Sequence, residues 1–184
     1  YGVAGAVDRE RSGTRIEADG SCGGFPRIPA AAEAAAAAVK ATVEWARRQS
    51  WAVKDRIVLV GTSAGGLASL AAAAKGPAGV VGVVNFSGGA AGYPKERPQA
   101  SCGEAVLTEV FRRAGREVKV PSLWLYAEND QYWGRRAPQA WHAAFAAGGS
   151  RSRLVMTPPL PDEDGHRLML RGGRMWGMHL APFV

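Results

Sequence analysis

The sequence predicts an α/β protein with a predominantly parallel sheet and helices on both of its faces. Short apolar runs rich in β-branched residues, typical of strands buried on both faces, recur along the chain. Stretches with the helical spacing of apolar residues alternate with these runs. Such an order brings the carboxyl ends of the strands to one edge of the sheet, where open α/β sheets usually bind their ligands.

The first half of the chain is expected to supply two of the four visible strands. Its first 29 residues are rich in Gly, Pro, Asp and Arg and show no periodicity, so they are predicted to be irregular. Pro29 suits the first position of a helix, where its missing N–H costs nothing. The elements expected after it are a helix at 30–48, a strand at 57–60, a turn at 61–66, a helix at 67–74 and a strand at 80–84.

The second half continues the alternation without a repeat or a second domain, so residues 1–184 are expected to form one domain. Gly148 and Gly149 follow the helix that precedes the last strand, as glycine commonly does at a helix end. The expected elements are a helix at 104–116, a strand at 122–127, a helix at 137–147, a strand at 154–156, a Pro- and Asp-rich loop at 158–165 and a helix at 168–180.

Composition and charge exclude several classes of protein. The 184 residues suit a single domain, and 47% hydrophobic with 21% charged residues is the balance of a globular protein. No stretch approaches the roughly 20 uninterrupted apolar residues of a membrane-spanning helix. The net charge of +7 is spread over both halves, with no run of five like charges, which argues against a nucleic-acid partner.

Residues 61–65, Gly-Thr-Ser-Ala-Gly, match the pattern G-x-S-x-G between an expected strand and an expected helix. In this setting the pattern indicates a nucleophile elbow, with small residues needed at Gly61 and Gly65 and the Ser63 hydroxyl raised above the sheet edge. The Ala64 N–H, at the helix N-terminus, is expected to stabilise an oxyanion. The alternative is a Gly-rich turn that only packs the helix; a dinucleotide loop would need glycine at position 63.

A serine nucleophile needs a base, and the chain offers three histidines. His142 lies within the expected helix 137–147, and His179 lies in the last helix, so both are expected to be packed or surface residues. His166 follows the last strand in a loop that can extend over the carboxyl edge of the sheet. We therefore predict that His166 is the base.

The acid that orients the histidine is expected after the strand at 122–127. Asp130 is the first choice, and Glu128 is the alternative because the geometry of the turn can exchange the two. Asp162 and Asp164 precede the histidine in its own loop, where we expect them to cap the chain or to remain solvated.

Four segments of the sequence resemble the dienelactone-hydrolase-like branch of the α/β-hydrolase superfamily: VLVGTSAGGLASL, VNFSGG, PSLWLYAENDQYW and PPLPDEDGHRL. The resemblance implies an α/β-hydrolase fold with Ser63 as nucleophile, Asp130 as acid and His166 as base, in the chain order of that superfamily. Dienelactone hydrolases use a cysteine nucleophile, so Ser63 favours an esterase-like enzyme.

The same resemblance implies eight strands, of which only the last four are expected here. The opening YGVAG resembles the loop after the fourth strand of that fold, and no HGG-type segment for a second oxyanion donor precedes Ser63. Without a neighbour, the strand at 57–60 would be an exposed apolar edge. We therefore expect the chain to be the C-terminal part of a longer catalytic domain, with the missing N-terminal part as its partner.

Cys22 and Cys102 lie in Gly-containing loops that are expected at the active-site edge. The even number of cysteines permits a disulfide between them, and two reduced cysteines are the alternative. A disulfide would indicate a bacterial periplasmic or secreted protein, and its absence a cytoplasmic one. Neither cysteine has the histidine spacing of a zinc site, so no metal and no cofactor is expected.

Aromatic residues surround the expected acid in sequence. Trp124 and Tyr126 alternate within a strand and are predicted to lie in the core. Tyr132 and Trp133 follow Asp130 directly and are predicted to line a substrate pocket.

Together these residues predict a metal-independent serine hydrolase that cleaves a small carboxylic ester, thioester or lactone through an acyl-enzyme. Two alternatives stay open at this point. One is a peptidase-like hydrolase of the same fold, and the other is a non-catalytic binding protein with an α/β-hydrolase-like fold.

Overall fold

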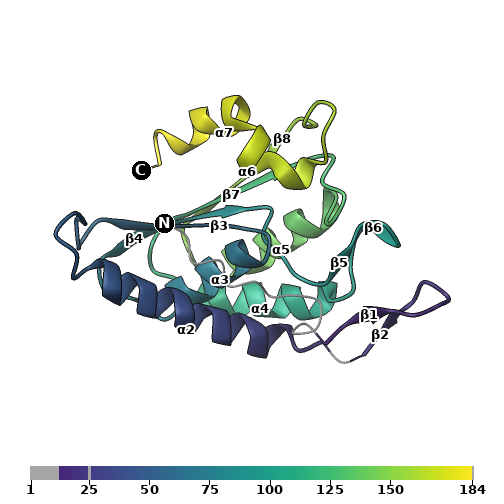
Figure 1. The fold of residues 1–184 in the computed structure, drawn as a ribbon, viewed down its shortest axis with the longest axis horizontal. Helices are drawn as coiled ribbons and strands as arrows, with labels where there is room; N and C mark the ends of the chain where they lie inside the picture. The colour runs from purple at the N-terminus through teal and green to yellow at the C-terminus, as the bar shows by residue number, and fades with distance from the viewer. Residues whose placement is uncertain (1–12, 25, 184) are drawn as a thin grey trace.

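The computed structural model describes residues 13–24 and 26–183. Its centre is a four-stranded parallel sheet with the strand order β3-β4-β7-β8 (Figure 1). Each strand coincides with an expected apolar run, and three of them extend beyond it. The strands are β3 (Ile57–Thr62), β4 (Val80–Phe86), β7 (Ser122–Ala127) and β8 (Ser152–Thr157).

In the described part of the chain, four helices cover one face of this sheet: α2 (Ile28–Ala46), α3 (Ala64–Ala73), α4 (Glu104–Glu117) and α5 (Arg136–Ala146). The larger hydrophobic core lies between them and the sheet, and Trp124 and Tyr126 are fully buried in it, as predicted. Helix α2 begins two residues earlier than expected, so Pro29 lies within its first turn, where no N–H is needed.

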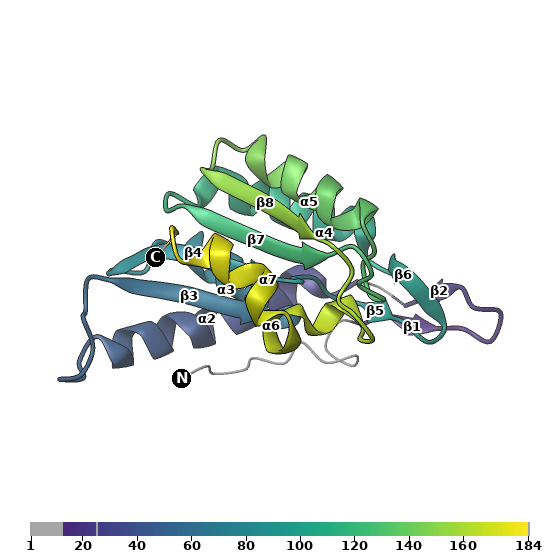
Figure 2. The ribbon, with the colours of Figure 1, turned by 90° about the horizontal axis from the view of Figure 1, so that it is seen from above.

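The other face is covered by a short 3₁₀ turn, η1 (Gly165–Arg167), followed by α6 (Leu168–Arg171) and α7 (Gly173–Leu180) (Figure 2). Leu168 and Trp176 pack here against the sheet, and the Trp176 ring meets the Phe86 ring edge-on at 5.3 Å. The single helix expected at 168–180 is wrong, because the chain breaks at Gly172. Two adjacent glycines, Gly172 and Gly173, weaken a helix at this point. The N–H of Gly172, the residue that caps α6, makes the last hydrogen bond of that helix, to the Leu168 carbonyl.

Two small antiparallel hairpins extend beyond the carboxyl edge of the sheet (Figure 2). They are β1 (Arg15–Ile16) with β2 (Cys22–Gly23), and β5 (Gly92–Tyr93) with β6 (Arg97–Ser101). The prediction of an irregular segment at 1–29 is therefore wrong for the first hairpin, whose two-residue strands are too short to show a period. The opening YGVAG lies outside the described residues.

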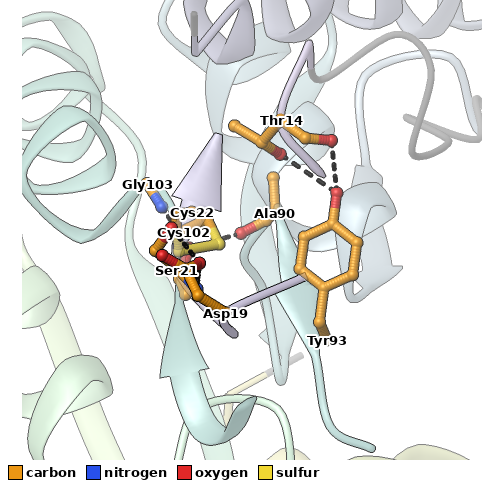
Figure 3. Close-up of a disulfide and its surroundings, with 9 residues drawn as sticks. Thr14, Asp19, Ser21, Cys22, Ala90, Tyr93, Cys102 and Gly103 are labelled. Atoms are coloured by element: carbon orange, nitrogen blue, oxygen red, sulfur yellow. Dashed lines mark hydrogen bonds between the residues drawn. A yellow bond between two sulfur atoms is a disulfide. The ribbon is translucent and has the colours of Figure 1, made fainter. Parts of the chain in front are cut away.

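A disulfide joins the two hairpins, as predicted. Cys22 on β2 is bonded to Cys102, which directly follows β6, and their Cα atoms are 5.5 Å apart. The Tyr93 hydroxyl donates a hydrogen bond to the carbonyl oxygen of Thr14, so a second contact joins the same two segments (Figure 3). The two hairpins are thus held together beyond the carboxyl edge of the sheet, where the catalytic residues are expected.

Strand β3 forms one edge of the sheet, and no other strand within residues 13–24 and 26–183 pairs with its outer side. Val60 on this strand is 45% exposed, which is unusual for a valine in a parallel sheet. In the described part of the chain, no helix is long and apolar enough to cross a membrane.

Candidate active site

Ser63 lies at the junction of β3 and α3 with a φ angle of +54°, which L-residues seldom adopt. Four backbone hydrogen bonds hold this conformation. The Ser63 N–H donates to the Phe86 carbonyl at 2.9 Å, and the Ser63 carbonyl accepts from the N–H groups of Gly66, Leu67 and Gly89 at 3.0–3.3 Å. The side chain itself is half-buried. A strained backbone held this firmly often marks a functional position, and the role of Ser63 as a nucleophile stays a prediction.

Close approach of strand and helix explains two of the glycines in this turn. A Cβ atom on Gly61 would lie 2.1 Å from the Gly65 carbonyl oxygen, and one on Gly66 would lie 2.1 Å from the Asn85 amide oxygen. A Cβ on Gly65 would meet no described atom within 4 Å. The expected need for a small residue at Gly65 is therefore wrong, and the constraint falls on Gly66.

Asp130 and His166 are joined directly. The Asp130 side chain is fully buried, and its two oxygens lie 3.2 and 3.1 Å from His166 Nδ1. The backbone N–H groups of Tyr132 and Trp133 donate to the same carboxylate at 2.8 and 3.2 Å. Because a carboxylate only accepts, Nδ1 carries the proton of this contact, and Nε2 is left as the acceptor.

Ser63, Asp130 and His166 follow three different strands at one edge of the sheet. Thr62 is paired in register with Phe86, and Ala127 with Thr157, so the strand ends lie level with one another. Among the described residues, the hydrogen bonds of the His166 ring go to Asp130 alone. In the described part of the chain no hydrogen bond joins the Ser63 hydroxyl to His166, so the pairing of serine and histidine stays a prediction.

Two aromatic rings enclose the imidazole. The Tyr132 ring is stacked on His166 at a centroid distance of 4.0 Å, and the Trp133 ring meets it edge-on at 5.6 Å. Trp133 is only 2% exposed, and its indole N–H donates to the Ser87 carbonyl at 2.7 Å. Trp133 therefore supports the histidine from the core side. Contact of either ring with a substrate stays a prediction.

The alternative acid and bases lie elsewhere. Glu128 forms an ion pair with Arg135 at 3.1 Å. His142 is half-buried edge-on to Trp124, and burial lowers its pKa. His179 lies on α7, and its Nδ1 is 2.7 Å from the side chain of Arg153 on β8. No group of three His, Cys, Asp or Glu side chains in the described ranges is arranged to hold a metal ion.

The two aspartates of the histidine loop differ in role. Asp164 caps η1 by accepting the His166 backbone N–H at 2.9 Å, which confirms the expected cap. Asp162 is exposed. The sequence patterns do not single out Asn129, although its side chain makes three hydrogen bonds to the loop that carries the histidine. The sequence feature that could have pointed to Asn129 is its position directly before the acid, in a short turn after a strand.

Ala64 is the first residue of α3, so its N–H has no acceptor within the helix. It lies beside Ser63, where the positive end of the helix dipole favours a negative charge. The role of the Ala64 N–H as an oxyanion donor stays a prediction.

Comparison with known proteins supports this architecture. The family model of the X-Pro dipeptidyl-peptidase (S15 family) matches residues 17–102. Among solved structures, the esterase Pf2001 of Pyrococcus furiosus is similar with a TM-score of 0.61 and 14% identity, over 88% of this chain and 64% of that one. The chain has an α/β-hydrolase fold. A putative dienelactone hydrolase of Klebsiella pneumoniae shares this fold with a TM-score of 0.56 and 17% identity, over 80% of this chain and 59% of that one.

Est816, described as an N-acyl homoserine lactone degrading enzyme, is a further similar α/β-hydrolase structure, with a TM-score of 0.53 and 16% identity. The match covers 83% of this chain and 74% of that one. No curated protein matches the sequence significantly. The chain spans 64% of the length of the Pyrococcus furiosus esterase and 59% of the length of the Klebsiella pneumoniae protein, so the likeness extends over part of their α/β-hydrolase fold.

Proposed function

We propose that this chain carries the catalytic groups of a serine hydrolase that cleaves a carboxylic ester, thioester or lactone. The observation that supports it most is the buried Asp130 carboxylate on Nδ1 of His166, at the sheet edge that also carries the strained Ser63. A buried acid, an imidazole with a free Nε2 and an accessible serine hydroxyl are the three groups that acyl transfer requires.

In this proposal the Ser63 oxygen attacks the substrate carbonyl while its proton passes to His166 Nε2. Asp130 keeps the other ring nitrogen protonated and stabilises the imidazolium that forms. The Ala64 N–H donates to the developing oxyanion. His166 then gives its proton to the leaving alcohol or thiol, and water attacks the acyl-enzyme by the same steps to release the acid.

A peptidase-like activity is the second candidate, and the match of residues 17–102 to the X-Pro dipeptidyl-peptidase model favours it. The same three side chains serve amide hydrolysis, because His166 can protonate a leaving amine as well as a leaving alcohol. The two candidates therefore differ in substrate recognition and share their chemistry.

Covalent labelling with a fluorophosphonate, followed by intact-mass measurement, tests the nucleophile. We expect one adduct on the wild type, none on Ser63→Ala, and an unchanged adduct on Ser50→Ala, an exposed serine in the loop before β3. Turnover of p-nitrophenyl acetate is then compared with that of Ala-Pro-p-nitroanilide. Faster Ser63-dependent turnover of the ester supports an esterase, and the reverse supports the peptidase.

The rival to both enzymes is a non-catalytic binding protein. Equal labelling of the wild type and Ser63→Ala, or no labelling of a folded wild type, would contradict the proposed nucleophile and favour that rival.

A further inference from the structure

Two loops meet at the proposed site. The acid turn, residues 128–131, follows β7 and carries Asp130, and the histidine loop, residues 158–166, follows β8 and carries His166. The distance between the carboxylate and the imidazole depends on how these loops are held against each other. Side chains from both loops make that connection.

Asn129 connects the acid turn to the histidine loop with its whole amide group. Its oxygen accepts the N–H of Leu160 at 2.9 Å. Its nitrogen donates to the carbonyl oxygens of Leu160 and Glu163, both at 3.0 Å. The amide therefore uses both of its donors and its acceptor on the backbone of the histidine loop, which fixes the path of that loop before it reaches His166.

Asp164 makes the reciprocal connection from the histidine loop. One of its oxygens, Oδ1, accepts the backbone N–H of His166 and the backbone N–H of Gln131, both at 2.9 Å. These two donors belong to the base itself and to the residue that follows the acid. A helix cap needs only the first of these contacts. The second contact uses the same carboxylate oxygen to join the histidine loop to the acid turn.

The close packing of Gly165 brings the two loops into direct contact. A Cβ atom at this position would lie 2.6 Å from the Asp130 backbone nitrogen and 2.6 Å from the Asn129 amide oxygen. The Gly165 N–H points toward the Asn129 carbonyl oxygen at 3.4 Å. Nothing larger than glycine fits here while Asn129 and Asp164 keep their hydrogen bonds.

We infer that Asp164 and Asn129 are positioning residues, whose side chains hold the His166 ring at hydrogen-bond distance from Asp130. The inference rests on the proposed serine-hydrolase function. Neither side chain contacts the reacting atoms. Both act through the backbone of the two loops, and a misplacement of about 1 Å in a catalytic group is enough to lower a rate by up to about a hundredfold.

The test compares three substitutions of these residues. Asp164→Ala removes the shared acceptor, and Asp164→Asn removes the same charge but keeps an oxygen that can accept both N–H groups. Asn129→Asp keeps the acceptor for Leu160 and removes both donors. Asp162→Asn is the matched control, because it removes one negative charge from an exposed position in the same loop.

Two readouts are measured on every variant: kcat and KM on p-nitrophenyl acetate, and the downfield proton resonance of His166 Nδ1–H, which reports the bond to Asp130. For Asp164→Ala and Asn129→Asp we expect kcat to fall about 10- to 100-fold, with little change in KM and with loss of the resonance. Asp164→Asn should stay within about threefold of the wild-type kcat, because a neutral oxygen still accepts both N–H groups. Asp162→Asn should resemble the wild type in both readouts.

A folded Asp164→Ala that keeps the resonance and the wild-type kcat would overturn the inference. An equal loss in Asp162→Asn would do the same. If Asp164→Ala does not fold, Asn129→Asp decides by the same two readouts. If the wild type shows no Ser63-dependent turnover, the proposed function has failed, and the resonance alone still decides whether Asp164 and Asn129 position the ring.

Discussion

Removal of the disulfide between Cys22 and Cys102 should destabilise the protein by a large fraction of its folding free energy. The two cysteines are 80 residues apart in the sequence. In the chain-entropy model, a crosslink that closes a loop of this length stabilises a fold by roughly 4 kcal/mol at 25 °C. Domains typically unfold with about 5–15 kcal/mol, so we expect the protein without the disulfide to be marginally stable.

The disulfide joins two small elements of the fold. The β1–β2 hairpin has only two residues in each strand, and hydrogen bonds between Thr14 and Tyr93 also join it to the second hairpin. Cys22 is exposed, so a thiol reagent can reach it in the folded protein. Chemical reduction and double substitution should therefore have the same effect.

Urea unfolding followed by tryptophan fluorescence measures the loss. Three samples are compared: the oxidised wild type, the reduced wild type and Cys22→Ser/Cys102→Ser. We expect the last two to coincide, with a free energy of unfolding roughly 4 kcal/mol below that of the first. The reasoning is refuted if the double variant lies within about 1 kcal/mol of the oxidised wild type, or if the reduced wild type behaves like the oxidised one.

Three further substitutions test other parts of the structure. Gly165→Ala should lower the free energy of unfolding by about 1–3 kcal/mol and slow fluorophosphonate labelling, because the new Cβ would displace Asp130; unchanged labelling would contradict this. Tyr126→Phe should cost about 1–3 kcal/mol in urea unfolding, since the buried Gly88 carbonyl loses its donor; a neutral result would contradict it. Burial lowers the pKa of His142 in the folded protein. Below about pH 6.5 this histidine therefore binds a proton more readily in the unfolded chain than in the folded one. Stability should therefore fall between pH 7 and pH 5 in the wild type and fall less in His142→Gln, as urea unfolding at the two pH values would show; equal pH dependence of the two proteins would contradict this.

The sequence is most informative where burial is complete. Strand β7, Ser122–Ala127, has the bounds expected from its apolar run, and all six of its residues are buried. The strands β1, β2 and β5 are two residues long, and no hydrophobic period can be read over so short a length. The helix predicted at 168–180 is interrupted at Gly172, where the backbone flexibility of glycine disfavours a continuous helix.

The candidate site is predictable only in part, for a related reason. Glu128 and Asp130 are both acids in one short turn, and spacing along the chain does not say which of them turns inward. Their environments differ in the structure: Asp130 is fully buried against His166, and Glu128 pairs with an arginine at the surface. The role of Asn129 depends on a loop about 30 residues later, and its position directly before the acid does not reveal that contact.

The outer side of β3 has a consequence for the colloidal behaviour of the protein. Among residues 13–24 and 26–183 no strand pairs with this side, so its backbone N–H and C=O groups, together with the half-exposed Val60, form an edge to which another strand can add. The opposing force is the repulsion between molecules of net charge +7 at pH 7. Salt screens that repulsion beyond about 8 Å at physiological ionic strength, and a rise in pH removes the charge itself. Dilute buffer near neutral pH should therefore keep the molecules apart, whereas alkaline or salty solutions should let the β3 edges of neighbouring molecules meet.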